Sequence, residues 1–264
     1  MSLFEELVKI MKTLHGPGGC PWDNEQTHES LKPYLIEEAY EVIEAIDSSS
    51  DKQLTEELGD LLLQVIFHAE IADSEGRFNI DDVIKGIIEK LKLRHPHVFG
   101  NITVDSSKQV IKNWEEIKRK EKREKKKGGS VLDGLPKNLP ALIKARRIQE
   151  KVSHIGFDWA RTEDVIFKIE EELKELKEAS RSNDRDAIEE ELGDLLFSVA
   201  NLARFVSLCP EDALRKTINK FQRRFQYIER ELPKRGKKLE EASLEEMDKL
   251  WEEIKTRESG QDPE

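Results

Sequence analysis

The chain has 264 residues, of which 38% are charged and 37% are apolar, and this balance favours a helix-rich globular protein over a disordered or all-β one. No stretch approaches the roughly 20 apolar residues of a membrane span, and the start, MSLFEELVKI, lacks the basic flank of a signal peptide, so we expect a cytoplasmic protein with no membrane partner. The net charge of -11 opposes binding to nucleic acid, although it leaves room for one basic pocket that takes a small phosphorylated ligand.

Apolar residues spaced three and four apart predict helices along the whole chain, and no pair of strands stands out. In the first half the predicted helices are 2–14, 29–47, 52–73, 80–93 and 106–126. A charged run, RKEKREKKKGG, followed by Gly and Pro then predicts a linker. In the second half the predicted helices are 139–152, 162–181, 184–207, 211–231 and 243–257, with Pro210 separating the third from the fourth.

The second half repeats the first. The segment EELGDLL occurs at 56–62 and again at 190–196, an offset of 134 residues. A second repeat, WEEIK, occurs at 114–118 and 251–255, so a small change of length falls between the two motifs. The sequence therefore predicts an all-α fold made of two tandem copies of one helical-bundle module. We expect the first module at 1–118, a charged linker at 119–138 and the second module at 139–264.

Each copy places carboxylates on two neighbouring helices. Residues three apart share a helix face, and a short polar connection makes the two helices antiparallel neighbours, so the four carboxylates of a copy converge. Gathered acids repel unless a cation neutralises them, and oxygen-only ligands favour magnesium, manganese or calcium over zinc. The predicted sets are Glu38, Glu41, Glu57 and Asp60 in the first copy, and Glu172, Glu175, Glu191 and Asp194 in the second.

The competing interpretation is a solvated acidic face, since the chain contains 55 acidic residues. The matched pairs, their recurrence in register and the apolar sequence after Asp60 and Asp194 favour the metal site. Gly59 and Gly193 add to this, because a glycine inside a helix costs about 1 kcal/mol relative to alanine and suggests close backbone approach. A di-iron bundle needs Glu-x-x-His pairs, and no acidic motif here has one.

These motifs resemble the MazG family of nucleoside triphosphate pyrophosphohydrolases, whose signature is an ExxE helix followed by an ExxD helix. The resemblance extends over nearly the whole chain and includes HPHVFG (95–100), GFDW (156–159), KFQRRF (220–225) and Trp251. It implies an all-α homodimer that uses magnesium, with manganese as an alternative. The implied reaction cleaves a nucleoside triphosphate between the α and β phosphates to give a monophosphate and pyrophosphate.

The resemblance also assigns roles to residues. It makes Glu172, Glu175, Glu191 and Asp194 metal ligands and places nucleotide contacts at Lys168, Lys220, Arg223, Arg224 and Trp251. Two plainer interpretations stay open, because the basic residues could form a solvated face and the tryptophan could belong to the core. Relatives can carry a basic residue where this chain has Ala187, which puts one phosphate contact in doubt.

A base must take the proton of the attacking water, and we assign this catalytic role to Glu171, whose counterpart is Glu37, with Glu175 as the alternative. Lys168 corresponds to Tyr34 in the first copy, where Lys90, Lys92 and Arg94 replace the KFQRRF pattern. We therefore expect the second module to carry most of the activity. The alternative function is a helical interaction protein that binds a partner through its acidic faces.

Overall fold

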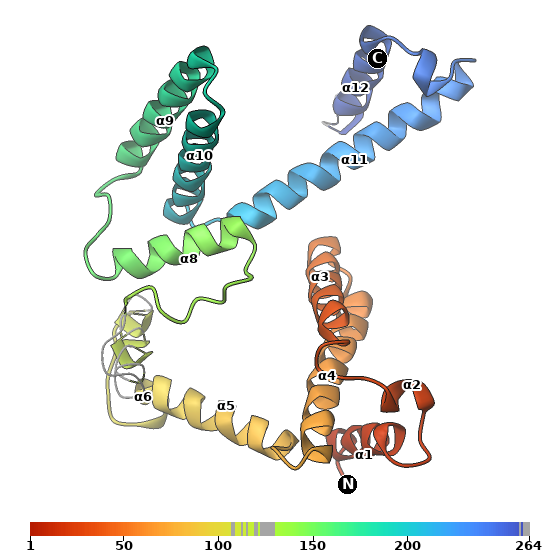
Figure 1. Cartoon of the computed structure of the whole chain (residues 1–264), viewed down its shortest axis with the longest axis vertical. Coiled ribbons are helices and arrows are strands. Elements are labelled where there is room, and N and C mark those ends of the chain that lie inside the picture. Colours follow the sequence, from red (N-terminus) through yellow and green to blue (C-terminus); the bar gives the residue numbers. More distant parts are fainter. Residues whose placement is uncertain are drawn as a thin grey trace. The chain divides into compact units, whose positions relative to one another are not determined.

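The computed structural model describes residues 1–106, 109–111, 113–114, 116–118, 121, 130–258 and 260. Within these ranges the regular secondary structure is helical and no strand occurs, which confirms the all-α prediction. The chain divides into two compact units, Met1–Lys125 and Lys126–Glu264 (Figure 1). The linker predicted at 119–138 stays a prediction, because residues 119, 120 and 122–129 lie outside the described part of the chain.

The first unit is organised around two long helices that form a hairpin. Ser49 adopts the left-handed conformation with φ of 54°, and Ser50 then caps the second helix by accepting a hydrogen bond from the amide of Gln53. A helix at the start of the chain packs on the second of the pair. The elements are α1 (Leu3–His15), α2 (Pro21–Asn24), α3 (Lys32–Ser48), α4 (Asp51–Ser74), α5 (Ile80–Arg94) and α6 (Pro96–Phe99).

The core of this unit lies toward the end of the hairpin that is remote from its turn. It contains the buried side chains of Met11 from α1, Leu31 from the residue before α3, and Ile66, Phe67 and Ile71 from α4. Apolar side chains from three segments therefore fix the base of the hairpin, while its turn end carries the acidic residues.

The second unit repeats the hairpin with the same turn chemistry. Asn183 is left-handed with φ of 57°, and the Asp184 side chain caps the following helix by accepting from the amides of Asp186 and Ala187. The elements are α8 (Ala141–Ser153), α9 (Thr162–Ser182), α10 (Arg185–Phe205), α11 (Pro210–Lys234), the 3₁₀ turn η1 (Leu239–Glu241) and α12 (Leu244–Glu258). A separate core of Tyr227, Ile228, Leu232 and Leu250 joins α11 to α12.

The predicted helices agree with the structure to within about three residues at each end. Pro210 begins α11, as expected of a residue that is tolerated only in the first turn. That helix also runs to Lys234 and includes Pro233, beyond the predicted end at 231. The predicted helix 106–126 lies partly outside the described residues, and the described ones from 109 to 121 are helical.

No single helix in the described ranges is long and apolar enough to cross a membrane. Taken together, α10 and α11 have the length and composition of a span, but the pair is bent by 104° at the break between Phe205 and Pro210.

Candidate metal centre and basic groups

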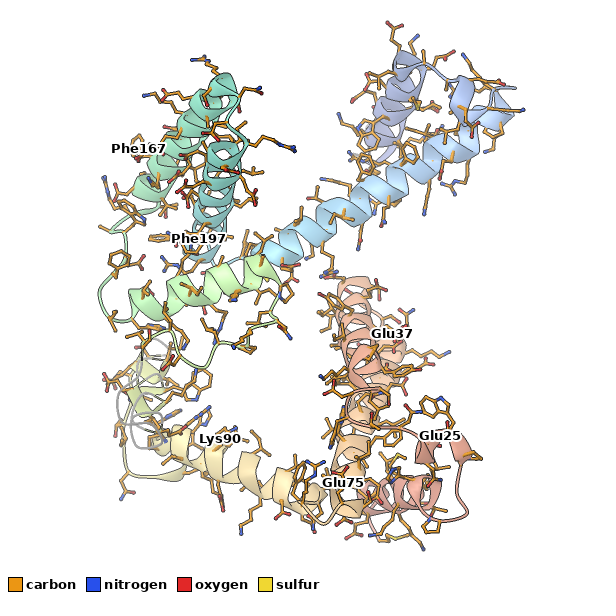
Figure 2. All side chains as sticks on the ribbon, in the orientation of Figure 1. Glu25, Glu37, Glu75, Lys90, Phe167 and Phe197 are labelled. Atoms are coloured by element: carbon orange, nitrogen blue, oxygen red, sulfur yellow. The ribbon has the colours of Figure 1, made fainter. Side chains whose placement is uncertain are left out.

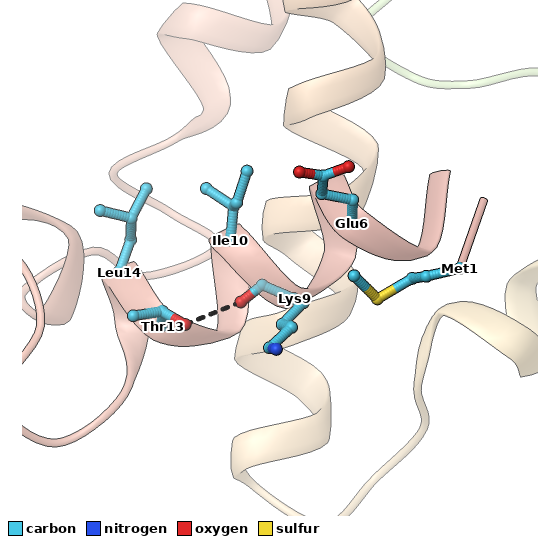
Figure 3. Close-up of a pocket in the computed structure, with 6 residues that line it drawn as sticks. All are labelled: Met1, Glu6, Lys9, Ile10, Thr13 and Leu14. Carbon is cyan, nitrogen blue, oxygen red and sulfur yellow. Dashed lines mark hydrogen bonds between the residues drawn. The ribbon is translucent and has the colours of Figure 1, made fainter. Parts of the chain in front are cut away.

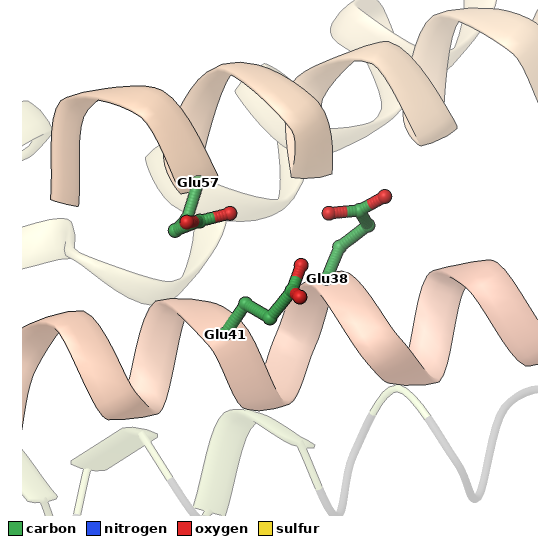
Figure 4. Close-up of side chains that lie close together, drawn as sticks. All are labelled: Glu38, Glu41 and Glu57. Carbon is green, nitrogen blue, oxygen red and sulfur yellow. The ribbon is translucent and has the colours of Figure 1, made fainter. Parts of the chain in front are cut away.

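The first acidic set lies between α3 and α4. Glu38 and Glu41 extend from α3, and Glu57 extends toward them from α4 (Figure 4). One carboxylate oxygen from each residue lies within 4.8 Å of the others. Asp60 falls outside this group of three, yet it acts on Glu38 electrostatically. Three of the four carboxylates that were predicted to converge therefore lie together across the helix pair, and the fourth, Asp60, does not join them.

The crowding of negative charge is visible in the protonation of this set. Burial and the charges of Asp60, Glu41 and Glu57 raise the pKa of Glu38. Burial and the charges of Glu41, Glu56 and Asp60 raise the pKa of Glu57. Like charges held this close favour the neutral form of a carboxyl group, and a bound cation reverses that preference. The possible ligands are all carboxylate oxygens, and a cation would relieve the repulsion among them. This set therefore fits a hard divalent ion.

The second acidic set has the same arrangement between α9 and α10. Oxygen atoms of Glu172, Glu175 and Glu191 lie within 4.8 Å of one another. Burial and the charges of Glu175, Glu172 and Asp194 raise the pKa of Glu191. Glu172 is only 5% exposed, so its carboxylate is held in place and largely shielded from water. Asp194 again lies beside the group rather than in it.

Lys168 contacts the second set directly. Its Nζ lies 2.8 Å from a carboxylate oxygen of Glu172 and 3.1 Å from one of Glu171. Hydrogen bonds to Glu172 and then Glu171 raise the pKa of Lys168 well above its ordinary value. In the first unit the corresponding residue is Tyr34, whose ring lies 6.0 Å from the ring of Trp22 at an angle of 82°. The two sets therefore differ by one positive charge.

Three of the predicted basic residues, Lys220, Arg223 and Arg224, lie on α11, and the two arginines face the C-terminal end of α12. Arg223 Nε and Arg224 Nε donate to the two oxygens of Glu258, at 2.9 and 2.8 Å. Burial tends to raise the pKa of Glu258, but the hydrogen bonds from Arg224 and Arg223 outweigh it and hold that pKa below its usual range. The Arg224 guanidinium also lies 5.4 Å from the ring centre of Trp251, a cation–π contact.

The structure does not bring these basic residues to the acidic set of the same chain. Within the described part of the second unit, α9 packs on α10 and makes no contact with α11 or α12. Lys168 is the one predicted nucleotide contact that lies beside the acids, whereas Lys220, Arg223, Arg224 and Trp251 lie on α11 and α12. Trp251 packs against the core of those two helices, so part of its surface is structural, as the plainer interpretation held.

Sequence comparison decides the family. The MazG nucleotide pyrophosphohydrolase domain matches residues 26–99 and 161–228, one match in each unit. Both matches contain a complete hairpin with its four acids. The chain belongs to the MazG family.

Two full-length relatives of this MazG protein carry functional names. It is 55% identical to the nucleoside triphosphate pyrophosphohydrolase/pyrophosphatase MazG of Thermotoga maritima, over 96% of each chain. It is 42% identical to the nucleoside triphosphate pyrophosphohydrolase of Escherichia coli K12, over 98% of this chain and 99% of the relative. A shorter match, 42% identity over 57% of this chain and 45% of the relative, links it to the nucleoside triphosphate pyrophosphohydrolase of Mycobacterium tuberculosis. The family resemblance and the tandem arrangement are confirmed.

Sequence reasoning missed the carboxylates that bind the arginines. In the first MazG unit the Arg94 guanidinium donates to both oxygens of Glu121, at 3.1 and 2.7 Å, and lies 5.9 Å from the ring of Trp114. This cluster reproduces the one that Arg224, Trp251 and Glu258 form in the second. The repeat that begins at WEEIK continues with a glutamate seven residues after each tryptophan, and this was the signal that could have found both carboxylates.

The expectation that another backbone approaches Gly59 and Gly193 is wrong for the described part of one chain. A Cβ added at Gly59 or Gly193 would meet nothing within 4 Å, so no backbone approaches either residue. The next residues toward the N-terminus, Leu58 and Leu192, are 50% and 45% exposed. Each glycine therefore lies on an open part of its helix, next in sequence to an exposed leucine.

The first histidine of HPHVFG contacts the second and the backbone of the preceding helix turn. The His95 and His97 rings are 5.7 Å apart, and His95 Nδ1 donates to the carbonyl of Leu91 at 2.8 Å. A shallow pocket on the outer side of α1 also lies apart from the acids. Figure 3 shows its six lining residues, all within residues 1–14, together with the bond from Thr13 Oγ1 to the carbonyl of Lys9 at 2.9 Å.

Proposed function

We propose that this MazG protein is a magnesium-dependent hydrolase that cleaves nucleoside triphosphates between the α and β phosphates, giving a nucleoside monophosphate and pyrophosphate. The observation that carries the proposal is the converging carboxylate set, present in both units and contained in both MazG matches. The functional names of the relatives support the substrate class. No Gly-rich phosphate loop of the P-loop type occurs in the sequence, which argues against cleavage at the terminal phosphate.

The second acidic set would hold magnesium, or manganese, through Glu172, Glu175, Glu191 and Asp194, and the first through Glu38, Glu41, Glu57 and Asp60. A bound divalent ion neutralises the negative charge of a polyphosphate and so favours departure of pyrophosphate. The chain's own groups orient the substrate. Lys168, Lys220, Arg223 and Arg224 would bind phosphate oxygens, and the exposed part of Trp251 would contact the base.

Glu171 is our proposed general base, with Glu175 as the alternative. Glu171 is exposed and accepts a contact from Lys168 at 3.1 Å, so it must give up this partner before it can take a proton from water. Glu171→Gln should lower kcat while magnesium binding, measured by calorimetry, stays intact. Glu170→Gln is the matched control, because Glu170 is the neighbouring exposed glutamate on α9. Full turnover by Glu171→Gln would remove the assignment.

A homodimer is part of the proposal, because the hairpin exposes apolar side chains that a monomer would leave in water. On α9 and α10, Phe167 is 64% exposed, Leu196 51% and Phe197 42%. Figure 2 labels the two phenylalanines. The open face at Gly193 lies on the same helix pair. A second copy that covers this face could also supply the basic helix that α9 lacks within one chain.

Oligomeric state tests this part. Leu196→Glu should convert a dimer to a monomer in size-exclusion chromatography with light scattering. Leu244→Glu, at a 79% exposed position on α12, should leave the dimer intact. A wild-type monomer, or a dimer that tolerates Leu196→Glu, would contradict the proposed interface.

Product analysis tests the reaction. The eight common nucleoside triphosphates are incubated with the protein and magnesium in ¹⁸O-labelled water, and the phosphate products are separated by chromatography. We expect monophosphate and pyrophosphate, with the label in the monophosphate. Orthophosphate as the first product would contradict cleavage between the α and β phosphates. No turnover of any substrate would favour the helical interaction protein instead.

A further inference from the structure

The residue one helical turn before each acidic set differs between the two units. On α3, Tyr34 lies one helical turn before Glu38, and on α9, Lys168 lies one turn before Glu172. Both residues occupy the same place in the hairpin, since Tyr34 and Lys168 are 134 residues apart, which is the offset of the repeated EELGDLL segment. The two residues differ in their effect on a nearby carboxylate, because a lysine can neutralise its negative charge and a neutral tyrosine cannot.

In the second unit the ammonium group acts as a counterion that belongs to the chain. Lys168 Nζ touches Glu172 at 2.8 Å, and Glu172 is one of the three residues whose oxygens converge. The Lys168 side chain is 33% exposed, so it can move into solvent without unfolding α9. In the described part of the first unit, no lysine or arginine pairs with Glu38, Glu41, Glu57 or Asp60.

We infer that Lys168 and a divalent cation compete for Glu172, so that the second unit takes up its metal together with a polyphosphate, whereas the first unit binds metal alone. The inference rests on the proposed function, since it uses the same acids. A cation that enters the second set must displace the ammonium group from Glu172 or tolerate its repulsion. A polyphosphate carries several negative charges and offers Lys168 a better partner, which frees Glu172. Tyr34 imposes no such requirement on the first set.

The test is calorimetric titration of the full-length protein with Mn²⁺ alone. We expect one equivalent of ion per wild-type chain, lost in Asp60→Asn and kept in Asp194→Asn. Lys168→Met should gain a second equivalent, because it removes the internal counterion. The reciprocal change, Tyr34→Lys, should weaken the first site at least tenfold.

Lys174→Met is the matched control. Lys174 also lies on α9, and its replacement removes the same charge. Its side chain is 77% exposed and pairs with Glu178 at 3.8 Å, outside the acidic set, so Lys174→Met should not add a Mn²⁺ site. Circular dichroism checks that each variant is folded. Should Lys168→Met not fold, Tyr34→Lys alone decides the inference.

Two results would overturn different claims. Two equal Mn²⁺ sites in the wild type, or no change in Lys168→Met and Tyr34→Lys, would overturn the competition between Lys168 and the ion. Absence of Mn²⁺ binding in every variant, with the protein folded and inorganic tripolyphosphate added, would instead overturn the metal centre of the proposed function.

Discussion

The two units keep one hairpin and change what surrounds it. Both have a left-handed residue followed by a cap in the turn, and both hold three converging glutamates with an aspartate beside them. Beside the acids, Tyr34 stands where the second unit has Lys168. In the arginine cluster, which lies away from the acids, Leu93 precedes Arg94 where Arg223 precedes Arg224. Under the proposed function, the shared acids would hold the divalent ion and the residues that differ would contact the phosphate chain. The duplication would then separate the requirements of the metal from those of the substrate.

The largest expected effect contrasts the two aspartates. Asp194→Asn should lower kcat on the order of 100-fold, because it removes a metal-supporting carboxylate from the unit that also has Lys168 and the paired arginines. Asp60→Asn should leave most of the turnover. Steady-state kinetics with one triphosphate and magnesium measures both. Equal losses, or a larger loss in Asp60→Asn, would make the first unit catalytic.

A smaller effect concerns the arginine that the first unit lacks. Arg223→Ala should raise KM roughly tenfold, since a charge-assisted hydrogen bond to phosphate contributes about 1.5–3 kcal/mol. Arg223 is 63% exposed and can turn from Glu258 to a ligand. Lys234→Ala, at a 68% exposed position on α11, is the control. An unchanged KM in Arg223→Ala would mean that Glu258 keeps this arginine during turnover.

One pH effect on stability should come from a histidine pair in the first unit. His28 Nδ1 and His68 Nδ1 lie 2.8 Å apart, and Arg77 contacts His28 Nε2 at 2.5 Å. Burial and the charge of His28 lower the pKa of His68 from 6.5. The folded unit therefore binds this proton less readily than the unfolded chain, and its stability is present above pH 6.5 and falls as the pH drops below that value.

Scanning calorimetry from pH 7.5 to about pH 5 measures this effect. The first-unit transition should move to lower temperature as the pH falls, and His68→Gln should flatten the slope. His154→Gln, at an exposed position in the second unit, should leave it unchanged. A slope that persists in His68→Gln would assign the pH dependence to other groups.

The smallest effect compares two buried glutamines. The Oε1 atoms of Gln64 and Gln149 are both buried without a hydrogen-bond partner, but Gln149 Nε2 donates to the carbonyl of Phe197 at 2.8 Å. Gln64→Met should stabilise the first unit by about 1 kcal/mol, because it removes an unsatisfied acceptor at nearly constant volume. Gln149→Met loses a real bond and should not stabilise the second. Urea unfolding measures both, and a destabilised Gln64→Met would show that its amide has a partner in solution.

Most of the fold followed from the sequence, because apolar spacing and turn residues are local signals. The hairpins were predicted for this reason, and so were the acid pairs, since i and i+3 positions share a face whatever lies around them. The role of Glu258 did not follow, because it depends on how α12 packs on α11. The expected close backbone approach at Gly193 was wrong for a related reason. Helix propensity shows that a glycine inside a helix is unusual, but it does not show whether another backbone packs against it.

The turn between the paired helices also sets the position of the acids. Ser50 caps α4 and Asp184 caps α10, and in both helices the glutamate of the acidic set follows its cap by seven residues, or about two turns. One residue inserted just after Ser50 would rotate Glu57 and Asp60 by about 100° relative to α3 and scatter the oxygens, although every acid would still be present. Three or four inserted residues would nearly restore the face, one turn further from Glu41. The number of residues between the turn and the acids therefore decides whether their oxygens converge, and for this convergence it matters more than which residues form the turn.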